Sequence, residues 1–508
     1  MTPVGGHGPE VTPVGGSGSG VTPVGGSASD VTSAGGDGSD VTPVGRRAVR
    51  GSLWLFGVNL VSKGSQMAVT LVLAAFLTEE GLGLVALAVA LVNIGQVVQS
   101  MGVYDVVSRT DRDPRRMAGT LLVLSAGVGV VLALALVLAA DGIAHAVDAP
   151  SVAPLVRLAA VSLPFSAVAG VQLGLLHRDL DFRRRMVPDA GGAVLGAAVT
   201  VVLAVTGAGP YSLVVGLLCT AVAQPVLGVV VGVRVRPVWD AAAAGEALRW
   251  IALVGPGALV AVLLINVDYL AIARVHGPEA VGVYSLAYRI AWVPYILVAV
   301  VIGGVVLPLC AKLLRDGAEL SEVVGRATSA VLVVTGGLYA VTAALADRVV
   351  VFGARWAEAA VPLALLCLYG LGLGLLHVWY QVLKAAGHAR RYLALEVSHL
   401  VLLVGGLLVF TRHGVVAVAL VQVAAAWLVV PCTWWALARR GIGPPLAALA
   451  RGAAGVVAAA GCCAAVAFGV GDVFGPPGSV VAALGEGVVL VVVSVVVVVA
   501  ANREVVRR

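Results

Sequence analysis

The sequence predicts an all-α integral membrane protein with about 14 transmembrane helices. Hydrophobic residues make up 60% of the 508-residue chain and charged residues only 12%, a composition outside the range of soluble globular domains. From residue 53 onward, apolar segments of about 20 to 27 residues follow one another with short polar breaks between them. Backbone groups inside a bilayer have to be paired within their own segment, so segments of this length are expected to be helices.

The first 50 residues consist of a ten-residue repeat that is rich in glycine, proline and serine, beginning MTPVGGHGPE and VTPVGGSGSG. Such a short, polar unit cannot bury a core, so we expect residues 1–50 to form a disordered N-terminal tail. The tail lacks a charged stretch followed by an apolar one and is therefore not expected to be a signal peptide. The first apolar segment is expected to direct insertion.

We place the membrane spans near residues 53–77, 82–107, 118–140, 152–176, 188–206, 210–233, 248–273, 280–308, 327–345, 358–383, 392–411, 414–438, 447–470 and 479–501. The basic residues test this number of spans, because lysine and arginine gather in the cytoplasmic loops of membrane proteins. With both termini in the cytoplasm, most of the 33 lysine and arginine residues fall in the predicted inner segments. We therefore predict a multi-pass protein of the cytoplasmic (cell) membrane with both termini cytoplasmic.

A short internal repeat indicates how the spans are grouped. Residues 80–88, EGLGLVALA, and 279–287, EAVGVYSLA, share the pattern E-x-x-G-x-x-x-L-A at the same kind of predicted outer turn. Six helices separate the copies, so both keep the same orientation, as in transporters built from parallel repeats. This predicts two pseudo-symmetric six-helix bundles, 51–240 and 241–440, followed by a C-terminal helix pair and short tail, 441–508.

The first predicted span, 53–77, contains a lysine near its middle. At about 1.5 Å per residue, Lys63 lies roughly 15 Å from the start of the span, so it is expected to face protein or a wet cavity. A lysine at this depth costs about 2.5 to 3.5 kcal/mol on insertion scales, which favours a paired or functional role. Asn59, Gln66 and Thr70 share its face of the helix, and together they predict a polar stripe.

Polar side chains also follow one face of the second and tenth predicted spans. The residues that we single out there are Asn93, Gln96, Tyr380 and Gln381. Together with the stripe around Lys63 and with Arg289, they are predicted to line one substrate-binding cavity. For each stripe the alternative is hydrogen bonding between packed helices.

Two charged residues, Asp268 and Arg289, lie at similar depths in the seventh and eighth predicted spans. One interpretation is a structural ion pair that offsets the cost of inserting both charges. The other is functional, with Arg289 binding an anion and Asp268 serving as an ion-coupling site. Glu396 and His399 are expected to support the structure. No metal or other cofactor is expected, because the six cysteines show no metal-site spacing.

Four segments, spread over the predicted helices, carry a family resemblance. They are LTEEGLGLVALAVALVNIGQVVQSMGV, GLLHRDLDFRRR, GVYSLAYRIAWVPYILVAVVIGGVVLPLCAKL and GARWAEAAVPLALLCLYG. In their order and spacing they resemble the polysaccharide transporters, or Wzx-type oligosaccharide flippases, of the multidrug/oligosaccharidyl-lipid/polysaccharide exporter superfamily. The resemblance covers about residues 48–440.

The resemblance implies two six-helix bundles, V-shaped in the membrane, around a cavity that opens alternately to each side. The implied cargo is an undecaprenyl-pyrophosphate-linked oligosaccharide, moved to the outer leaflet without covalent chemistry, so the protein is not expected to be an enzyme. The cationic cavity residues of the family correspond here to Lys63 and Arg289. Implied partners are membrane lipids and polysaccharide polymerase or assembly proteins. Nucleic acid is not expected, since the basic residues occur in short clusters between apolar segments.

Three alternatives to a flippase remain to be weighed. A multidrug or cation exporter of the same superfamily would favour acids in the cavity, whereas Asp268 is the clear mid-span acid here. A membrane glycosyltransferase or polymerase would need sizeable outer loops with catalytic acids, and the predicted outer loops are short. A non-transporting scaffold of a polysaccharide assembly complex is compatible with the sequence.

Overall fold

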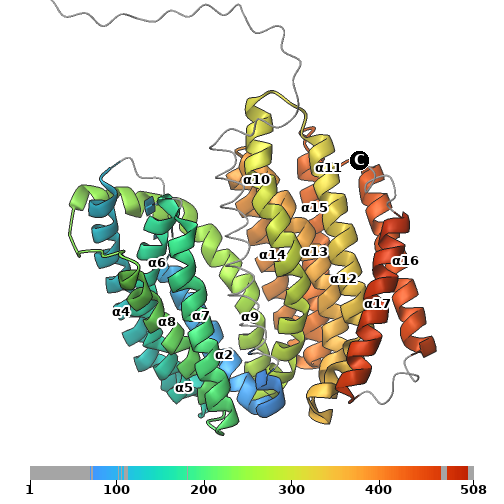
Figure 1. Ribbon diagram of the computed structural model, residues 1–508, viewed down its shortest axis with the longest axis horizontal. Coiled ribbons are helices and arrows are strands. Elements are labelled where there is room, and N and C mark those ends of the chain that lie inside the picture. Colours follow the sequence, from blue (N-terminus) through green and yellow to red (C-terminus); the bar gives the residue numbers. More distant parts are fainter. Residues whose placement is uncertain are drawn as a thin grey trace, which may run out of the picture. The chain divides into compact units, whose positions relative to one another are not determined.

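The computed structural model describes the chain beyond the predicted tail, and its regular structure there is helical (Figure 1). The described residues are Val69, 72–100, 102–103, 106–107, 112–179, 181–470 and 478–501. All belong to the compact unit Val49–Arg508, and the unit Met1–Ala48 lies outside them. The predicted tail and most of the predicted first span therefore fall outside the described residues. No strand occurs among the described residues, and the all-α prediction is confirmed.

Twelve helical segments among the described residues are long and apolar enough to cross a membrane. One of them, Ala241–Arg315, contains two spans, because α9 (Ala241–Pro294) is interrupted at Gly277. Gly277 has φ 79° and ψ 179°, a conformation that glycine adopts readily, and Pro278 begins the second arm with a φ suited to a helix. Each predicted span from 82–107 onward overlaps a single helix, a run of two or three consecutive helical elements, or one arm of the segment Ala241–Arg315. The prediction of a multi-pass membrane fold is confirmed.

Two groups of helices contact each other mainly through α9. The first group consists of α2 (Glu79–Ser100), α4 (Pro114–Ala146), α5 (Val152–Ala160), α6 (Ser162–Arg178), α7 (Phe182–Val205) and α8 (Tyr211–Val230). The second consists of α10 (Val300–Arg315), α11 (Ser321–Ala330), α12 (Gly336–Ala344), α13 (Ala360–Ala385), α14 (Ala389–Phe410) and α15 (Val415–Ala438). Shorter helical turns join them: η1 (Tyr295–Ala299), η2 (Val331–Thr335), η3 (Ala346–Phe352), η4 (Ala354–Ala359) and η5 (Thr411–His413).

A closing pair, α16 (Leu446–Val470) and α17 (Val480–Ala501), packs on itself and against α11 and α12. This arrangement agrees with the two bundles and the C-terminal pair that the repeat predicts. The boundaries at residues 240 and 440 stay a prediction.

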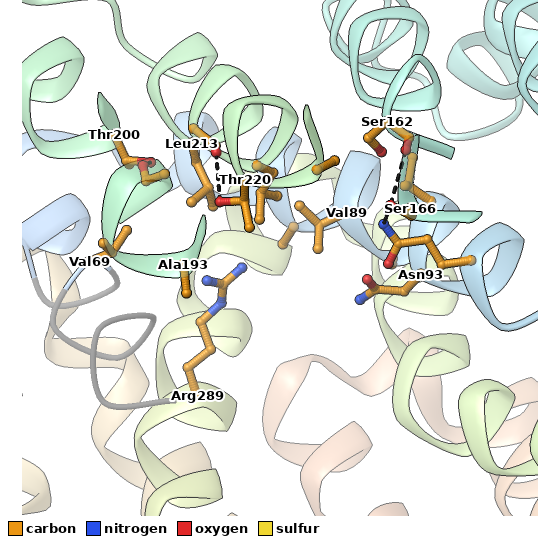
Figure 2. A pocket seen from close by; sticks show the side chains of 18 of the residues that line it. Val69, Val89, Asn93, Ser162, Ser166, Ala193, Thr200, Leu213, Thr220 and Arg289 are labelled. Atoms are coloured by element: carbon orange, nitrogen blue, oxygen red, sulfur yellow. Dashed lines mark hydrogen bonds between the residues drawn. The ribbon is translucent and has the colours of Figure 1, made fainter. Parts of the chain in front are cut away.

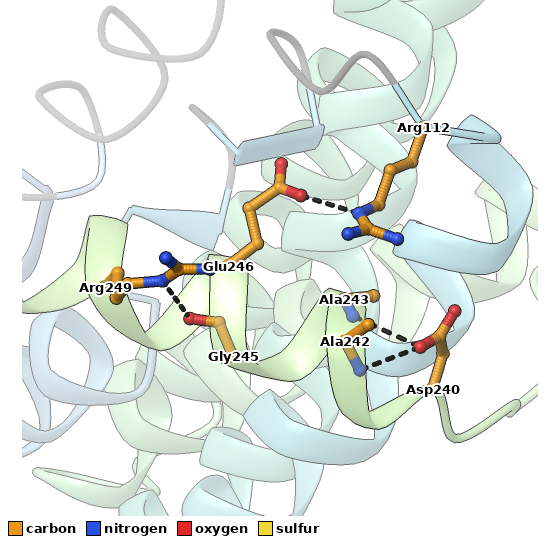
Figure 3. A network of polar contacts seen from close by, with 7 residues as sticks. All are labelled: Arg112, Asp240, Ala242, Ala243, Gly245, Glu246 and Arg249. Carbon is orange, nitrogen blue, oxygen red and sulfur yellow. Dashed lines mark hydrogen bonds and ion pairs between the residues drawn. The ribbon is translucent and has the colours of Figure 1, made fainter. Parts of the chain in front are cut away.

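The long helix α9 joins the two groups, and its first arm is held beside the start of α4. Asp240 caps this arm by accepting hydrogen bonds from the amides of Ala242 at 2.9 Å and Ala243 at 3.2 Å (Figure 3). These hydrogen bonds, that from Ala243 foremost, lower the pKa of the Asp240 carboxyl below its usual value. Further along the arm, Oε2 of Glu246 lies 2.7 Å from Nε of Arg112, which precedes α4. The cap marks where the first arm begins, and the exposed ion pair joins the arm to the chain before α4.

At the end that the predicted topology places outside, α2 crosses the second arm of α9 with no side chain between the two backbones. A Cβ atom on Gly83 would lie 1.7 Å from the carbonyl oxygen of Pro278, and one on Gly282 would lie 1.9 Å from that of Glu79. Gly83 and Gly282 are the equivalent glycines of the internal repeat, and each meets the residue before the repeat glutamate of the other copy. This contact, the glycine crossing, is therefore pseudo-symmetric and supports the repeat relationship.

A second contact at the same end joins η4 to the chain just before α2. Trp356 is buried, and its Nε1 donates a hydrogen bond of 2.9 Å to the carbonyl oxygen of Ala74. Nη2 of Arg355 donates to the carbonyl oxygens of Ala74 and Ala75, both at 3.2 Å. The chain around α2 is thus held at two adjacent places, by α9 at the glycine crossing and by η4.

A buried ion pair holds α17 to the second bundle. Oε2 of Glu486 lies 2.6 Å from Nη2 of Arg348 on η3, and these side chains are 4% and 11% exposed. Removing one partner of a buried pair costs about 3 to 5 kcal/mol, so we expect Glu486→Ala to lower the thermal unfolding temperature of the purified protein. Glu322→Ala, which removes an exposed pair with Arg326, is the control and should leave it unchanged. Equal unfolding of both variants would contradict this account of α17.

Candidate functional site

A cavity of about 630 Å³ lies among α2, α6, α7, α8 and both arms of α9 (Figure 2). This volume falls within the range of small-molecule sites, about 300 to 1,000 Å³. The wall from the first bundle carries polar side chains between small apolar ones, and the wall from α9 carries aromatic rings and an arginine. Such a pocket among membrane-spanning helices is a candidate site for a polar solute.

The wall from the first bundle presents amide and hydroxyl groups. Its polar residues are Asn93, Gln96, Ser162, Ser166, Thr200, Thr220 and Gln224. Nε2 of Gln96 donates to Oγ of Ser166 over 3.4 Å, which joins α2 to α6. Amides and hydroxyls both donate and accept hydrogen bonds, so this wall suits a ligand that is rich in hydroxyl groups.

Helices α7 and α8 approach closely through two glycine–threonine contacts. A Cβ atom on Gly196 would lie 1.8 Å from Oγ1 of Thr220, and one on Gly216 would lie 1.8 Å from Oγ1 of Thr200. Each hydroxyl donates to the carbonyl four residues earlier on its own helix, at 2.8 Å for Thr200 and 3.0 Å for Thr220. Thr200 and Thr220 are not among the predicted site residues. The signal was the G-x-x-x-T pattern of both helices, a spacing typical of closely packed membrane helices.

One face of the second arm of α9 forms the other wall. Tyr288, Arg289 and Trp292 line the cavity there. The rings of Tyr288 and Trp292 stack, with centroids 5.4 Å and planes 22° apart, and Trp292 packs on Tyr295 with centroids 4.6 Å apart. Figure 2 shows the side chain of Arg289 pointing away from its helix into the cavity. This wall combines a cation with a rigid aromatic surface.

Asp268 lies behind the α9 wall rather than in the cavity. Its carboxylate is fully buried and accepts hydrogen bonds from the Tyr284 hydroxyl at 2.8 Å and Nε2 of Gln422 at 2.9 Å. The amide of Tyr269 donates a third hydrogen bond of 2.9 Å. Within the described part of the chain no ion pair joins Asp268 to Arg289, so the structural ion-pair interpretation of these charges is wrong. The network instead connects both arms of α9 with α15.

Tyr380 and Gln381 lie inside the second bundle, away from the cavity lining. Nε2 of Gln381 is 3.4 Å from Nε2 of His377, whose Nδ1 is 3.0 Å from the hydroxyl of Tyr295. Tyr380 packs edge-on against Tyr392, with ring centroids 5.1 Å apart. These contacts join α13 to η1 and α14. A substrate-binding role for Tyr380 and Gln381 stays a prediction.

Three of the predicted substrate-binding residues line the cavity together: Asn93, Gln96 and Arg289. Three others lie outside the described residues: Asn59, Lys63 and Gln66. Val69, from the same predicted span as Lys63, does line the cavity. That any of them binds cargo stays a prediction. Across the described ranges, no three His, Cys, Asp or Glu side chains are grouped to hold a metal ion.

A family model described as polysaccharide biosynthesis protein matches residues 72–361, more than half of the chain. The chain is 24% identical over 332 residues to the lipopolysaccharide biosynthesis protein WzxC of Escherichia coli (strain K12), covering 64% of this chain and 67% of that protein. It is also 24% identical over 352 residues to the succinoglycan biosynthesis transport protein ExoT of Rhizobium meliloti (strain 1021), covering 65% and 71%.

Solved structures of transporters share the fold. Lipid II flippase MurJ, in an inward closed conformation, superposes with a TM-score of 0.73 at 12% identity, covering 90% of this chain and 100% of that one. An inward-facing multidrug resistance transporter of the MATE family, of the MOP superfamily, gives a TM-score of 0.59 at 14% identity, covering 76% and 98%. At these identities the likeness concerns the fold alone.

Proposed function

Because the chain belongs to the family of polysaccharide biosynthesis proteins, we propose that it is a flippase that moves a lipid-linked oligosaccharide across the cytoplasmic membrane. The product would supply cell-surface polysaccharide biosynthesis, as the names of two relatives suggest. The observation that carries the proposal is the polar, arginine-bearing cavity of about 630 Å³ among the membrane helices.

A lipid-linked oligosaccharide needs a protein to cross the membrane. An oligosaccharide joined to a lipid through phosphate is too polar to enter hydrocarbon, because each hydroxyl or charge would lose its hydrogen bonds to water. A cavity lined by amides and hydroxyls replaces those hydrogen bonds, while the prenyl chain stays among the lipids. Transport then needs movement of the helices and no covalent step.

Each kind of side chain in the cavity is assigned one part of the cargo. Arg289 binds the phosphate groups, because a guanidinium forms paired, charge-assisted hydrogen bonds with phosphate oxygens. Asn93 and Gln96 bind sugar hydroxyls, and the flat surface of Trp292 packs on the apolar face of a sugar ring. Lys63 is proposed as a second cation for the phosphates.

The two bundles are proposed to rock about the cavity, as in transporters built from parallel repeats. With the glycine crossing closed, cargo enters from the predicted cytoplasmic side, and separation of α2 from α9 then releases it outside. Asp268 is proposed as the ion-coupling site. Its hydrogen bonds to Tyr284 and Gln422 tie both arms of α9 to α15, so an ion or proton bound there would act on the moving helix.

A multidrug or cation exporter is the rival within the same superfamily. A cationic drug would be held by acidic side chains, and the described residues that line the cavity include Arg289 and no aspartate or glutamate. Asp268 is turned away from the cavity into its own hydrogen-bond network. The charge of the cavity therefore favours an anionic cargo.

Deletion of the gene tests the proposed function. We expect lipid-linked oligosaccharide to accumulate in the inner leaflet while surface polysaccharide disappears, and a plasmid copy of the gene should restore both. The leaflet distribution is measured with a membrane-impermeant lectin or glycosidase applied to oriented vesicles. An unchanged leaflet distribution of the lipid-linked oligosaccharide in the deletion strain would exclude the proposed flippase function.

A further inference from the structure

A groove of about 530 Å³ lies between α14 and α15 near their predicted cytoplasmic ends, and no residue of the transport cavity lines it. Its α14 side carries Arg391, Ala394 and Ser398, and its α15 side carries Cys432 and Trp435. Trp435 is 52% exposed, so the groove opens outward from the bundle. In a membrane protein this surface faces lipid.

The groove exists because the facing side chains are small and one helix is irregular. Ala394 and Ser398 face Cys432 and Ala436, which leaves unfilled space between the helices. Pro431 lies inside α15, where its missing amide hydrogen removes a backbone hydrogen bond. A slot of this kind between membrane helices admits a hydrocarbon chain.

The apolar surface continues beyond the groove toward the middle of the membrane. Val401 on α14, one turn beyond Ser398, is exposed, and so is Leu428 on α15, one turn beyond Cys432. A chain that starts in the groove therefore meets hydrocarbon-compatible surface along both helices.

Two arginines lie at the predicted cytoplasmic end of the groove. Arg391 lies in the first turn of α14, and Arg439 follows the last residue of α15 with its Cζ 3.8 Å from the centroid of the Trp435 ring. Within the described residues neither arginine forms an ion pair with an acid. The groove thus joins an apolar slot to positive charge at the end of the two helices where the predicted topology places the inner-leaflet headgroups.

We propose that this groove binds an anionic phospholipid of the inner leaflet, with the phosphate between Arg391 and Arg439 and an acyl chain in the slot. Basic pockets between helices on the cytoplasmic side suit anionic lipid headgroups. The site is independent of the transport cavity and of its cargo. A bound lipid would bridge α14 and α15 at the end opposite to the turn η5 that joins them.

Native mass spectrometry of the full-length purified protein tests the proposal, with phosphatidylglycerol and phosphatidylcholine as probes. We expect the parent to retain phosphatidylglycerol preferentially. Arg391→Gln and Arg439→Gln should each weaken that retention roughly fivefold, and the double variant more than tenfold. Arg412→Gln, at the predicted outer end of the same two helices, is the matched control and should bind like the parent.

Ser398→Leu separates a built site from plain attraction of charges, because it fills the slot and keeps both arginines. We expect it to lose phosphatidylglycerol while eluting from a size-exclusion column like the parent. The proposal is overturned if Ser398→Leu or the double arginine variant binds like the parent, if glycerol phosphate competes as well as the whole lipid, or if the groove proves to be covered in a dimer.

Discussion

Replacing Gly83 by leucine is expected to reduce transport by roughly two orders of magnitude, because α2 and α9 then cannot close at the glycine crossing. Added volume in a packed interface costs about 1 to 3 kcal/mol, and the upper end applies here. A Cβ atom at Gly83 would lie 1.7 Å from the backbone oxygen of Pro278, and backbone cannot turn aside as a side chain can. A cost near 3 kcal/mol shifts the equilibrium between closed and open states roughly 100-fold.

The position of the equilibrium is measured by labelling a cysteine in the cavity. Thr220→Cys, in a chain whose six native cysteines have been replaced, is exposed to a membrane-impermeant thiol reagent from the outer side. We expect slow labelling in the parent and fast labelling after Gly83→Leu. Gly282→Leu should act in the same way, because the two glycines are equivalent in the crossing.

Gly245→Ala is the matched control for the crossing. It lies on the same helix α9, and a Cβ atom there would meet nothing within 4 Å. Labelling and transport should match the parent. If Gly83→Leu and Gly282→Leu also behave like the parent, the crossing does not close the outer side, and the proposed transport cycle is wrong at that step.

Most of the fold was predictable because each membrane span is encoded by one continuous stretch of the sequence. Membrane spans are recognised from uninterrupted apolar length, and α9 shows the limit of that reading, since a single helical segment contains two spans separated only by Gly277. The internal repeat contained information about a helix contact as well as about the symmetry of the two bundles. Both copies of the repeat share a glycine, and its role is to let the two helices approach closely where the copies cross. Sequence alone does not show that the copies cross.

The site was predictable only in part, because a polar stripe defines a helix face but not its neighbour. Asn93, Gln96 and Arg289 line one cavity, whereas Tyr380 and Gln381 follow the same kind of pattern and face the inside of the second bundle. In both cases the residues were predicted to lie on one polar face of their own helix. The rotation of each helix against its neighbours decides between them.

Asp268 illustrates a second limit. Depth in the membrane suggested Arg289 as its partner, but Tyr284 and Gln422 hold the carboxylate instead. Tyr284 lies across the kink of α9 and Gln422 lies on α15, so both contacts depend on the folded packing. A buried carboxylate can be hydrogen-bonded by neutral donors as well as by a cation. Neutral donors are uncharged, so the sequence does not mark them as partners of an acid.

Replacing Arg289 by alanine is expected to lower cargo binding and transport by roughly 30-fold or more, while the amount of protein in the membrane stays normal. Losing one partner of a buried, hydrogen-bonded charge interaction costs about 2 to 5 kcal/mol. Arg289→Lys keeps the charge without the planar guanidinium, so we expect it to restore activity in part. Arg157→Ala is the control, because this arginine is 43% exposed in a surface pair with Asp141.

The assignment of phosphate to Arg289 and of sugar to Trp292 is tested by binding two probes to purified protein. A short-chain polyprenyl pyrophosphate contains only the phosphates, and a lipid-linked oligosaccharide contains both parts of the cargo. Arg289→Ala should weaken binding of both probes, since both carry the anion. Trp292→Ala should weaken only the oligosaccharide probe, because the stacked surface of Tyr288 and Trp292 contacts the sugar. If Arg289→Ala binds the bare pyrophosphate like the parent, the anion is held elsewhere, and Lys63 becomes the cation to replace next.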